Sequence, residues 1–260
     1  MISKIVKAEF TMLIGEIKQY YLNYIFYNLS ILVLYFGLFY NFFSSDAKEN
    51  ILAMLISLVL WQICSNAIQY LSYLIQDEAM MGTLEQMFLT RTSFITILLT
   101  KILVNMIFVL VKGLIMFVLC TIIFGQISIL SNLDIFECLL IIFICVITTF
   151  TFYCIGGIFG GLSLYFKRIS SLLNVFDYFL LLFTGIVNSI YNYPPIFYLA
   201  LNLIPITQAN SIIKSICTNS FIWSSLFNFV LLSIIYIIVS YKCLTMLIDT
   251  AKMKGKLGQY

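Results

Sequence analysis

The sequence "ILAMLISLVLWQICSNAIQYLSYLI", residues 51–75, is a long apolar run without a charged side chain. A helix needs about 20 mostly apolar residues to cross the hydrocarbon core of a bilayer, and this run is long enough. Five further runs have the same character: residues 20–43, 94–124, 135–166, 172–190 and 221–241. Strands of a membrane barrel would be about ten residues long and would alternate strictly. We therefore expect residues 1–260 to form one all-α polytopic membrane domain with six transmembrane helices.

The overall composition supports this class. The chain is 62% hydrophobic and 10% charged, with a mean hydropathy of +1.07, whereas a soluble domain carries about 25% charged residues. It contains no histidine, and its seven cysteines are scattered mostly within apolar runs. We interpret the cysteines as small hydrophobic residues. We expect neither a metal site nor a catalytic residue.

The distribution of basic residues predicts an orientation. Most of the 14 lysines and arginines precede the first apolar run, follow the second or the fourth, or follow the sixth. Only Lys48 and Lys214 belong to the opposite side, and Lys112 lies inside a run. By the positive-inside rule, both termini and the tail 242–260 are then cytoplasmic. This asymmetry accounts for the net charge of +3 without a nucleic-acid partner. The composition, rich in Ile, Phe, Asn, Lys and Tyr and poor in Ala, Pro and Arg, suggests an AT-rich bacterial genome, so we expect a bacterial cytoplasmic membrane.

Residues 1–19 have an amphipathic pattern. Ile2, Val6, Phe10 and Ile17 fall on one face of a helix, and the lysines fall on the opposite face. This pattern is typical of a helix that lies in the membrane interface, with its apolar side in lipid. The alternative is a helix that packs on the membrane-spanning bundle.

The polar insert "QDEAMMGTLEQMFLTRTS", residues 76–93, separates the second and third runs. Thr83 and Gln86 have the spacing of a capping box, which predicts a short helix that starts at Thr83 and ends near residue 89. Leu84, Met87 and Phe88 would form its apolar face. That face would either dock on a partner protein or tuck against the membrane.

The segment 191–221 is too polar and too interrupted by proline to span the bilayer, yet it contains the apolar stretch "IFYLALNLI". We expect a re-entrant segment in the outer leaflet, between the fifth and sixth spans.

Lys112 lies near the middle of the third predicted span, where a charged side chain is costly and by default suggests a function. Asp177 and Glu137 are candidate partners. We expect Lys112 to face the bundle interior or a transport path, pairing with Asp177 or lining a wet cavity with it. The alternative is that Lys112 reaches along the helix toward the interface.

The sequence "GGIFGG", residues 156–161, places small residues at two overlapping G-x-x-x-G spacings, which allow helices to approach closely. Gly156, Gly157, Gly160 and Gly161 are therefore predicted to pack helices, within the chain in preference to a dimer seam.

Residues 77–103, "DEAMMGTLEQMFLTRTSFITILLTKIL", resemble the signature loop of type 2 ABC transporter permeases. In that family acidic residues precede G-T-L-E, and a hydrophobic helix, a Thr/Ser turn and a span with an early lysine follow. The matching positions are Glu78, Gly82, Thr83, Leu84, Glu85, Thr90, Ser93 and Lys101. Arg91 replaces the usual proline, and Thr100 replaces a frequent glycine.

Residues 181–216 resemble the family's segment between its last two spans. The resemblance is carried by a glycine at a span end, a proline loop and a Pro-[LI]-T element. These residues are Gly185, Pro194, Pro195, Pro205, Ile206 and Thr207, with Lys214 where the family often has arginine.

The resemblance implies the membrane permease subunit of an ABC exporter, in which two identical or similar permeases form the translocation path. The insert would be the coupling helix that docks on a separate ATP-binding subunit. Its contact residues would be Asp77, Glu78, Gly82, Thr83, Leu84, Glu85, Met87 and Phe88. Alternating access would move an amphipathic substrate, such as an antibiotic, a peptide or a lipid-linked molecule.

The sequence contains no G-x-x-x-x-G-K-[ST] phosphate-binding loop, so we expect ATP and Mg²⁺ to bind the partner subunit and no cofactor to bind this chain. Two other functions stay open. A secondary transporter would show inverted repeats and spans broken centrally by glycine or proline, and neither is evident. The other is a non-transporting immunity or sensor subunit.

Overall fold

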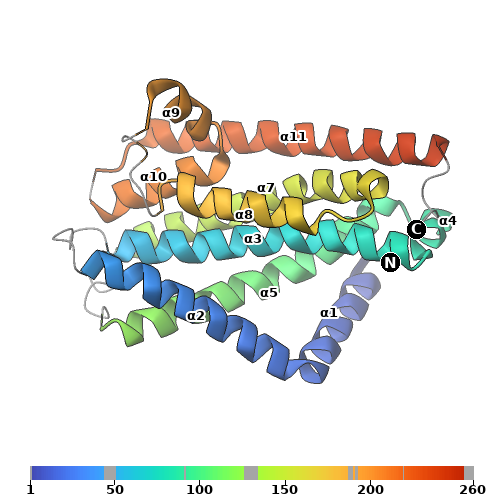
Figure 1. The fold of residues 1–260 in the computed structure, drawn as a ribbon, viewed down its shortest axis with the longest axis horizontal. Helices are drawn as coiled ribbons and strands as arrows, with labels where there is room; N and C mark the ends of the chain where they lie inside the picture. The colour runs from blue at the N-terminus through green and yellow to red at the C-terminus, as the bar shows by residue number, and fades with distance from the viewer. Residues whose placement is uncertain are drawn as a thin grey trace.

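The computed structural model describes residues 2–43, 51–90, 92–125, 134–186, 190, 193–218 and 220–254, and these ranges contain helices and no strand (Figure 1). The helices are α1 (Ile2–Gln19), α2 (Tyr21–Phe43), α3 (Ile51–Met80), α4 (Thr83–Leu89), α5 (Phe94–Ile123), α7 (Ile135–Phe166), α8 (Ser170–Phe183), α9 (Pro195–Asn202), α10 (Pro205–Cys217) and α11 (Trp223–Met253). Both ends of the described chain lie near α4, at what we call the α4 end of the bundle (Figure 1).

Among the described residues, five helices are long and apolar enough to cross a membrane: α2, α3, α5, α7 and α11. The pair α9 and α10 bends by 92° at a short break and would count as a sixth crossing if it were one span. The chain therefore has the helices of a multi-pass membrane protein. The bent pair falls where a re-entrant segment is predicted.

The fifth predicted span, 172–190, differs from the structure. Helix α8 has 14 residues, about 21 Å at 1.5 Å per residue, which is shorter than the ~30 Å hydrocarbon core. It ends because Gly185 has a φ of 82°, a left-handed conformation that glycine adopts without steric cost. The Lys214 ammonium donates to the Gly185 carbonyl and the Asn210 amide donates to the Thr184 carbonyl. Helix α10 thus caps the end of α8.

Replacing Lys214 with methionine is expected to loosen the end of α8. A hydrogen bond to a charged group contributes about 1.5–3 kcal/mol, so amide exchange over residues 180–186 should accelerate by about tenfold or more. Hydrogen–deuterium exchange measures this, with Lys18→Met at the exposed end of α1 as the control. Unchanged exchange in Lys214→Met would show that the cap does not hold the helix.

Helix α3 is the centre of the bundle. Most of its side chains are buried, and α7, α5, α10 and α8 pack around it. Its closest neighbour is α7, where a Cβ added to Gly156 would lie 2.7 Å from the Ile68 carbonyl oxygen. A Cβ added to Gly160 would instead meet the side chain of Ile75 of α3, 2.6 Å from its Cδ1 atom. The missing side chains are what allow the two backbones to touch.

The other two glycines of the run face α11. Added Cβ atoms on Gly157 and Gly161 would meet Leu244 and Leu247 respectively. Because these leucines pack on α7, α11 continues to Met253 and does not end at residue 241 as predicted. Most of the predicted tail 242–260 is therefore a packed helix, and residues 255–260 lie outside the described part of the chain.

Helix α1 matches the predicted range and packs against α5 and α2. Phe10 on its apolar face is 48% exposed, whereas Glu9 is half-buried against α5. The helix therefore contacts the bundle through one side and leaves apolar surface uncovered on another. Both sequence interpretations of residues 1–19 thus have some support, and its placement in a membrane interface stays a prediction.

Candidate functional site

The polar insert begins inside α3. The second apolar run was predicted to end at residue 75, but α3 continues to Met80, so Asp77 and Glu78 belong to its last turns and not to a loop. The chain then turns at Gly82, with a φ of 72°, and α4 follows at once. The insert is thus a helical extension of the second predicted span, followed by a short helix that packs against α3.

The predicted capping box between Thr83 and Gln86 is wrong. Gly82 occupies the N-cap position of α4, and no side chain caps the helix there. The Thr83 hydroxyl instead donates to the Glu78 carbonyl oxygen at 3.2 Å and contacts the Glu78 carboxylate. The extension of α3 is the cause, because it brings Glu78 beside Thr83.

The predicted apolar face of α4 packs within the chain. Leu84 is only 1% exposed, and Met87 and Phe88 are half-buried against the core. The centroids of the Phe88 and Phe94 rings lie 4.6 Å apart, and the Lys252 ammonium lies 3.9 Å from the Phe88 centroid. These residues hold α4 on the bundle.

The exposed apolar residues of this end are different ones. Met81 is 75% exposed and Leu89 is 86% exposed, and Glu85 and Gln86 are exposed between them. Helical spacing did not single them out, because Met81 precedes α4 and Leu89 is its last residue. The sequence feature that could have identified them is their position at the two ends of the short helix.

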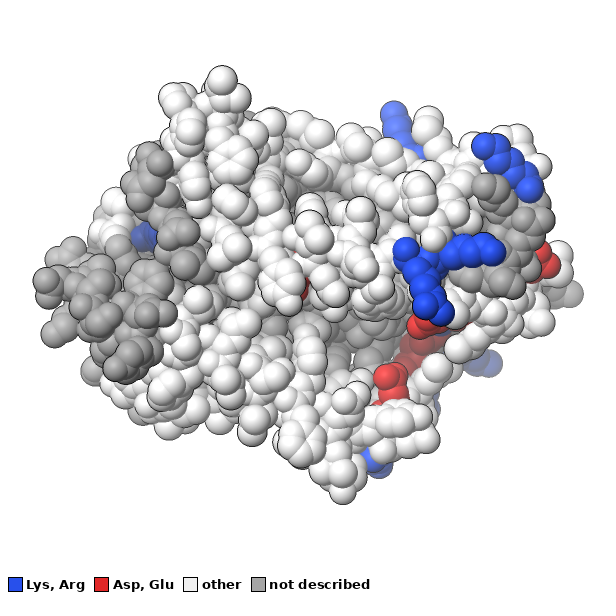
Figure 2. Space-filling model, viewed as in Figure 1, with Lys and Arg blue, Asp and Glu red and all other residues white. Residues whose placement is uncertain are grey.

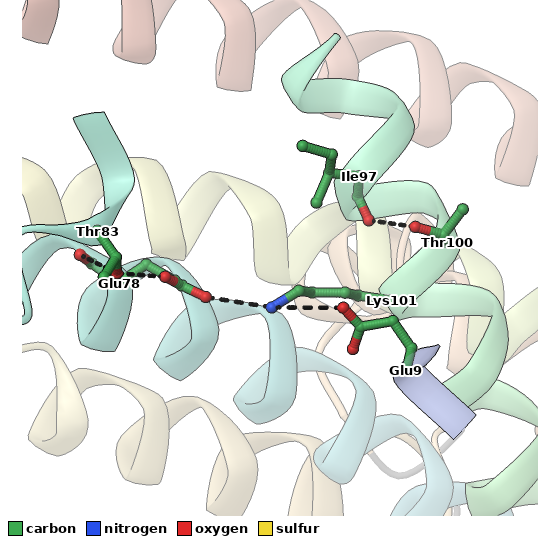
Figure 3. A network of polar contacts seen from close by, with 6 residues as sticks. All are labelled: Glu9, Glu78, Thr83, Ile97, Thr100 and Lys101. Atoms are coloured by element: carbon green, nitrogen blue, oxygen red, sulfur yellow. Dashed lines mark hydrogen bonds and ion pairs between the residues drawn. The ribbon is translucent and has the colours of Figure 1, made fainter. Parts of the chain in front are cut away.

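An ion cluster ties this end together (Figure 3). The Lys101 ammonium lies 3.1 Å from the Glu78 carboxylate and 3.9 Å from the Glu9 carboxylate. Lys101 is buried in α5, Glu78 belongs to α3 and Glu9 to α1. Through Thr83 the same cluster reaches α4. A displacement of α4 would therefore act on three longer helices at once.

Charged side chains gather around this cluster. Figure 2 shows lysine, arginine and acidic side chains concentrated at the α4 end of the visible face, while the rest of that face is mostly uncharged.

Ser93 caps helix α5, which follows α4, since its hydroxyl accepts a hydrogen bond from the Thr96 amide at 3.2 Å. Arg91, the main departure from the family pattern, lies outside the described residues.

Lys112 and Asp177 do not form an ion pair in the described part of the chain. The Lys112 ammonium lies 4.3 Å from the centroid of the Tyr27 ring. Asp177 packs near Ser65 and accepts the Trp61 indole at its backbone carbonyl, 3.2 Å away, while its Oδ1 atom is buried without a hydrogen-bond partner. The alternative partner Glu137 instead accepts the Asp134 amide at the start of α7.

Lys112 lines a cavity of about 320 Å³ between α2, α3 and α5. Its lining is formed by Asn23, Tyr24, Tyr27, Asn66, Gln69, Tyr70, Asn105, Phe108, Val109 and Lys112. This polar and aromatic lining lies among helices that are otherwise apolar. The sequence patterns pointed to Lys112 but not to the amides around it.

Among the described residues no three His, Cys, Asp or Glu side chains are close enough to hold a metal ion. All seven cysteines are free thiols. A comparison of the sequence with protein-family models finds no matching family, and a comparison with curated proteins finds no match.

Proposed function

We propose that the chain is the permease subunit of an ATP-driven ABC exporter, in which α4 docks on a separate ATP-binding subunit. The observation that carries the proposal is the α4 end itself. Leu84 anchors the short helix on the bundle, while Met81 and Leu89 remain exposed beside the charge of Glu85. Exposed apolar side chains next to a polar rim are typical of a protein contact surface.

The ion cluster supports a coupling role. A partner that moves α4 also moves Glu78, and Lys101 and Glu9 then connect that motion to α5 and α1. The basic residues near this end favour a cytoplasmic location by the positive-inside rule. ATP and Mg²⁺ would bind the partner, and a second permease, identical or similar, would complete the path across a bacterial cytoplasmic membrane.

Replacing Leu89 with aspartate is expected to release the ATP-binding subunit. A buried charge at the centre of an interface costs at least about 2 kcal/mol, so recovery of the subunit from mild detergent should fall by about tenfold or more. Affinity purification of the tagged chain from membranes of its own host, followed by mass spectrometry, measures this. Leu89 is already exposed, so the substitution spares the fold.

The matched control is Ile196→Asp. Ile196 is 85% exposed on α9, which lies at the opposite end of the bundle from α4 (Figure 1). A subunit with a P-loop that accompanies the unsubstituted chain and Ile196→Asp, but not Leu89→Asp, supports the proposal. Absence of any ATPase would instead favour a secondary transporter. A bound ATPase without transport would favour an immunity or sensor subunit.

A further inference from the structure

The cavity between α2, α3 and α5 has a lining that suits a ligand of defined chemistry. A volume of about 320 Å³ falls at the lower end of the range of small-molecule sites. Polar side chains inside a membrane bundle are costly and generally line a functional cavity. A second cavity, about 300 Å³ between α3, α5 and α7, is lined almost entirely by apolar side chains and offers no such recognition.

Lys112 forms no ion pair with the residues that the structure describes. Within the described ranges, no carboxylate lies within 4.0 Å of its ammonium, which lies 4.3 Å from the centroid of the Tyr27 ring. A cation–π contact stabilises an ammonium only modestly. A ligand anion in the cavity would supply the missing negative charge.

Neighbouring amides leave further groups for a ligand. The Asn105 oxygen accepts the Tyr153 hydroxyl at 2.5 Å, and the Gln69 nitrogen donates to the Ser65 hydroxyl at 3.3 Å. The Asn105 nitrogen and the Gln69 oxygen make no hydrogen bond to the described residues, although both residues line the cavity. The Asn105 NH₂ group offers N–H donors and the Gln69 oxygen offers an acceptor.

The spacing of these groups indicates an elongated ligand. Asn105 and Lys112 are seven residues apart on α5, so they share a face and are separated by about 10 Å along the helix. Between them Phe108 and Val109 line the cavity, and the Tyr24 ring packs edge-on against Phe108 at 6.1 Å. One end of the site is thus cationic, the middle is apolar and aromatic, and the other end is an amide.

Helices α2 and α5, which line the cavity, also carry exposed apolar residues such as Phe26, Leu103, Ile107 and Val111. A ligand that reaches the site between such helices must partition into lipid first.

We propose that this cavity binds an anionic amphiphile, with its acidic group at Lys112, an apolar body along Phe108 and Val109, and a second polar group at Asn105 and Gln69. The interpretation of the cavity as a substrate site rests on the proposed exporter function. It narrows the substrate of that exporter to anionic amphiphiles. A membrane lipid or a free amphiphile could provide this chemistry, and the experiment below distinguishes them.

The test uses a dansyl-labelled undecanoic acid as probe, with its uncharged carboxamide as the matched neutral probe. Fluorescence titration of the purified full chain in nanodiscs of zwitterionic lipid should show tighter binding of the carboxylate. Lys112→Met should weaken carboxylate binding by about tenfold and leave carboxamide binding unchanged. Lys112→Arg should restore the preference for the anion. A general loss of folding would weaken both probes and would not respond to arginine.

Competition then identifies the source of the anion. Displacement of the probe by phosphatidylglycerol would assign the site to an anionic lipid, and displacement only by single-chain carboxylates would assign it to a free amphiphile. Equal binding of both probes, or unchanged carboxylate binding by Lys112→Met, would overturn the proposal. The titration needs no ATP-binding subunit. If the probe binds but no ATPase is recovered at purification, the exporter is rejected and the anion site stands. If an ATPase is recovered but the probe does not bind, the exporter stands and the anion site is rejected.

Discussion

Gly156→Leu is expected to weaken the packing of α7 on α3 and to lower the stability of the fold. A Cβ at this position would lie 2.7 Å from the Ile68 carbonyl oxygen and 2.9 Å from its Cα atom. Backbone atoms cannot rotate away as a flexible side chain can, so the two helices must separate. Overpacking a core costs about 1–3 kcal/mol even where side chains can adjust, and a shift of the central helix pair should cost more.

The expected result is a fall in melting temperature of about 10 °C or more, since ~1 kcal/mol corresponds to about 2–4 °C in a chain of this size. Fluorescence-detected size exclusion after heating measures it in detergent. Gly15→Leu is the control, because an added Cβ at Gly15 meets nothing within 4 Å. A Gly156→Leu protein as stable as this control would contradict the packing of α7 on α3.

Lys101→Met is expected to destabilise the α4 end. The substitution leaves the Glu9 and Glu78 carboxylates, each about one-fifth exposed, next to one another without a cation. Breaking a fully buried pair costs about 3–5 kcal/mol, and partial exposure should reduce this to about 1–3 kcal/mol. Amide exchange in α1 and α4 should therefore accelerate, while exchange in the centre of α7 should stay slow.

The double variant Lys101→Met with Glu78→Gln should recover part of the lost protection, because it removes one of the two stranded charges. Lys254→Met, an exposed lysine near the end of the described chain, is the control. If the double variant exchanged faster than Lys101→Met alone, electrostatic pairing would not be the reason for the effect.

The long spans were predictable because local chemistry marks their ends. The range predicted for α7, 135–166, matches the structure. Asp134 and Lys167 flank that apolar run, and Asp134 forms a capping box with Glu137 that starts the helix. The start of α5 at Phe94 is set in the same local way by Ser93.

The elements that differed depend on distant residues. Residues 172–190 are apolar enough for a span, yet α8 ends early at the left-handed Gly185, whose carbonyl accepts a hydrogen bond from Lys214, 29 residues further along the chain. The continuation of α11 depends on leucines that pack on glycines of α7. Neither contact can be predicted from the hydropathy of the sequence.

The candidate site was predictable in place but not in detail. The spacing from Gly82 to Glu85 located the polar insert, and the structure places a helix there. Which side chains of that helix are exposed depended on how α4 folds back on α3, so Leu84 is buried and Leu89 is free. Similarly, the position of Lys112 near the middle of a predicted span suggested a functional residue. Its neighbours, however, depend on which face α5 turns toward α2 and α3.

The most direct test of the central proposal is photo-crosslinking at the α4 end. A benzophenone amino acid would replace Leu89 or, as the control, Ile196, and intact membranes of the host would be irradiated before solubilisation. The proposal predicts a crosslink from position 89 to a subunit with a P-loop, and none from position 196. Crosslinks from position 89 to lipid alone, or equal crosslinks from both positions, would contradict the role of α4 as a coupling helix.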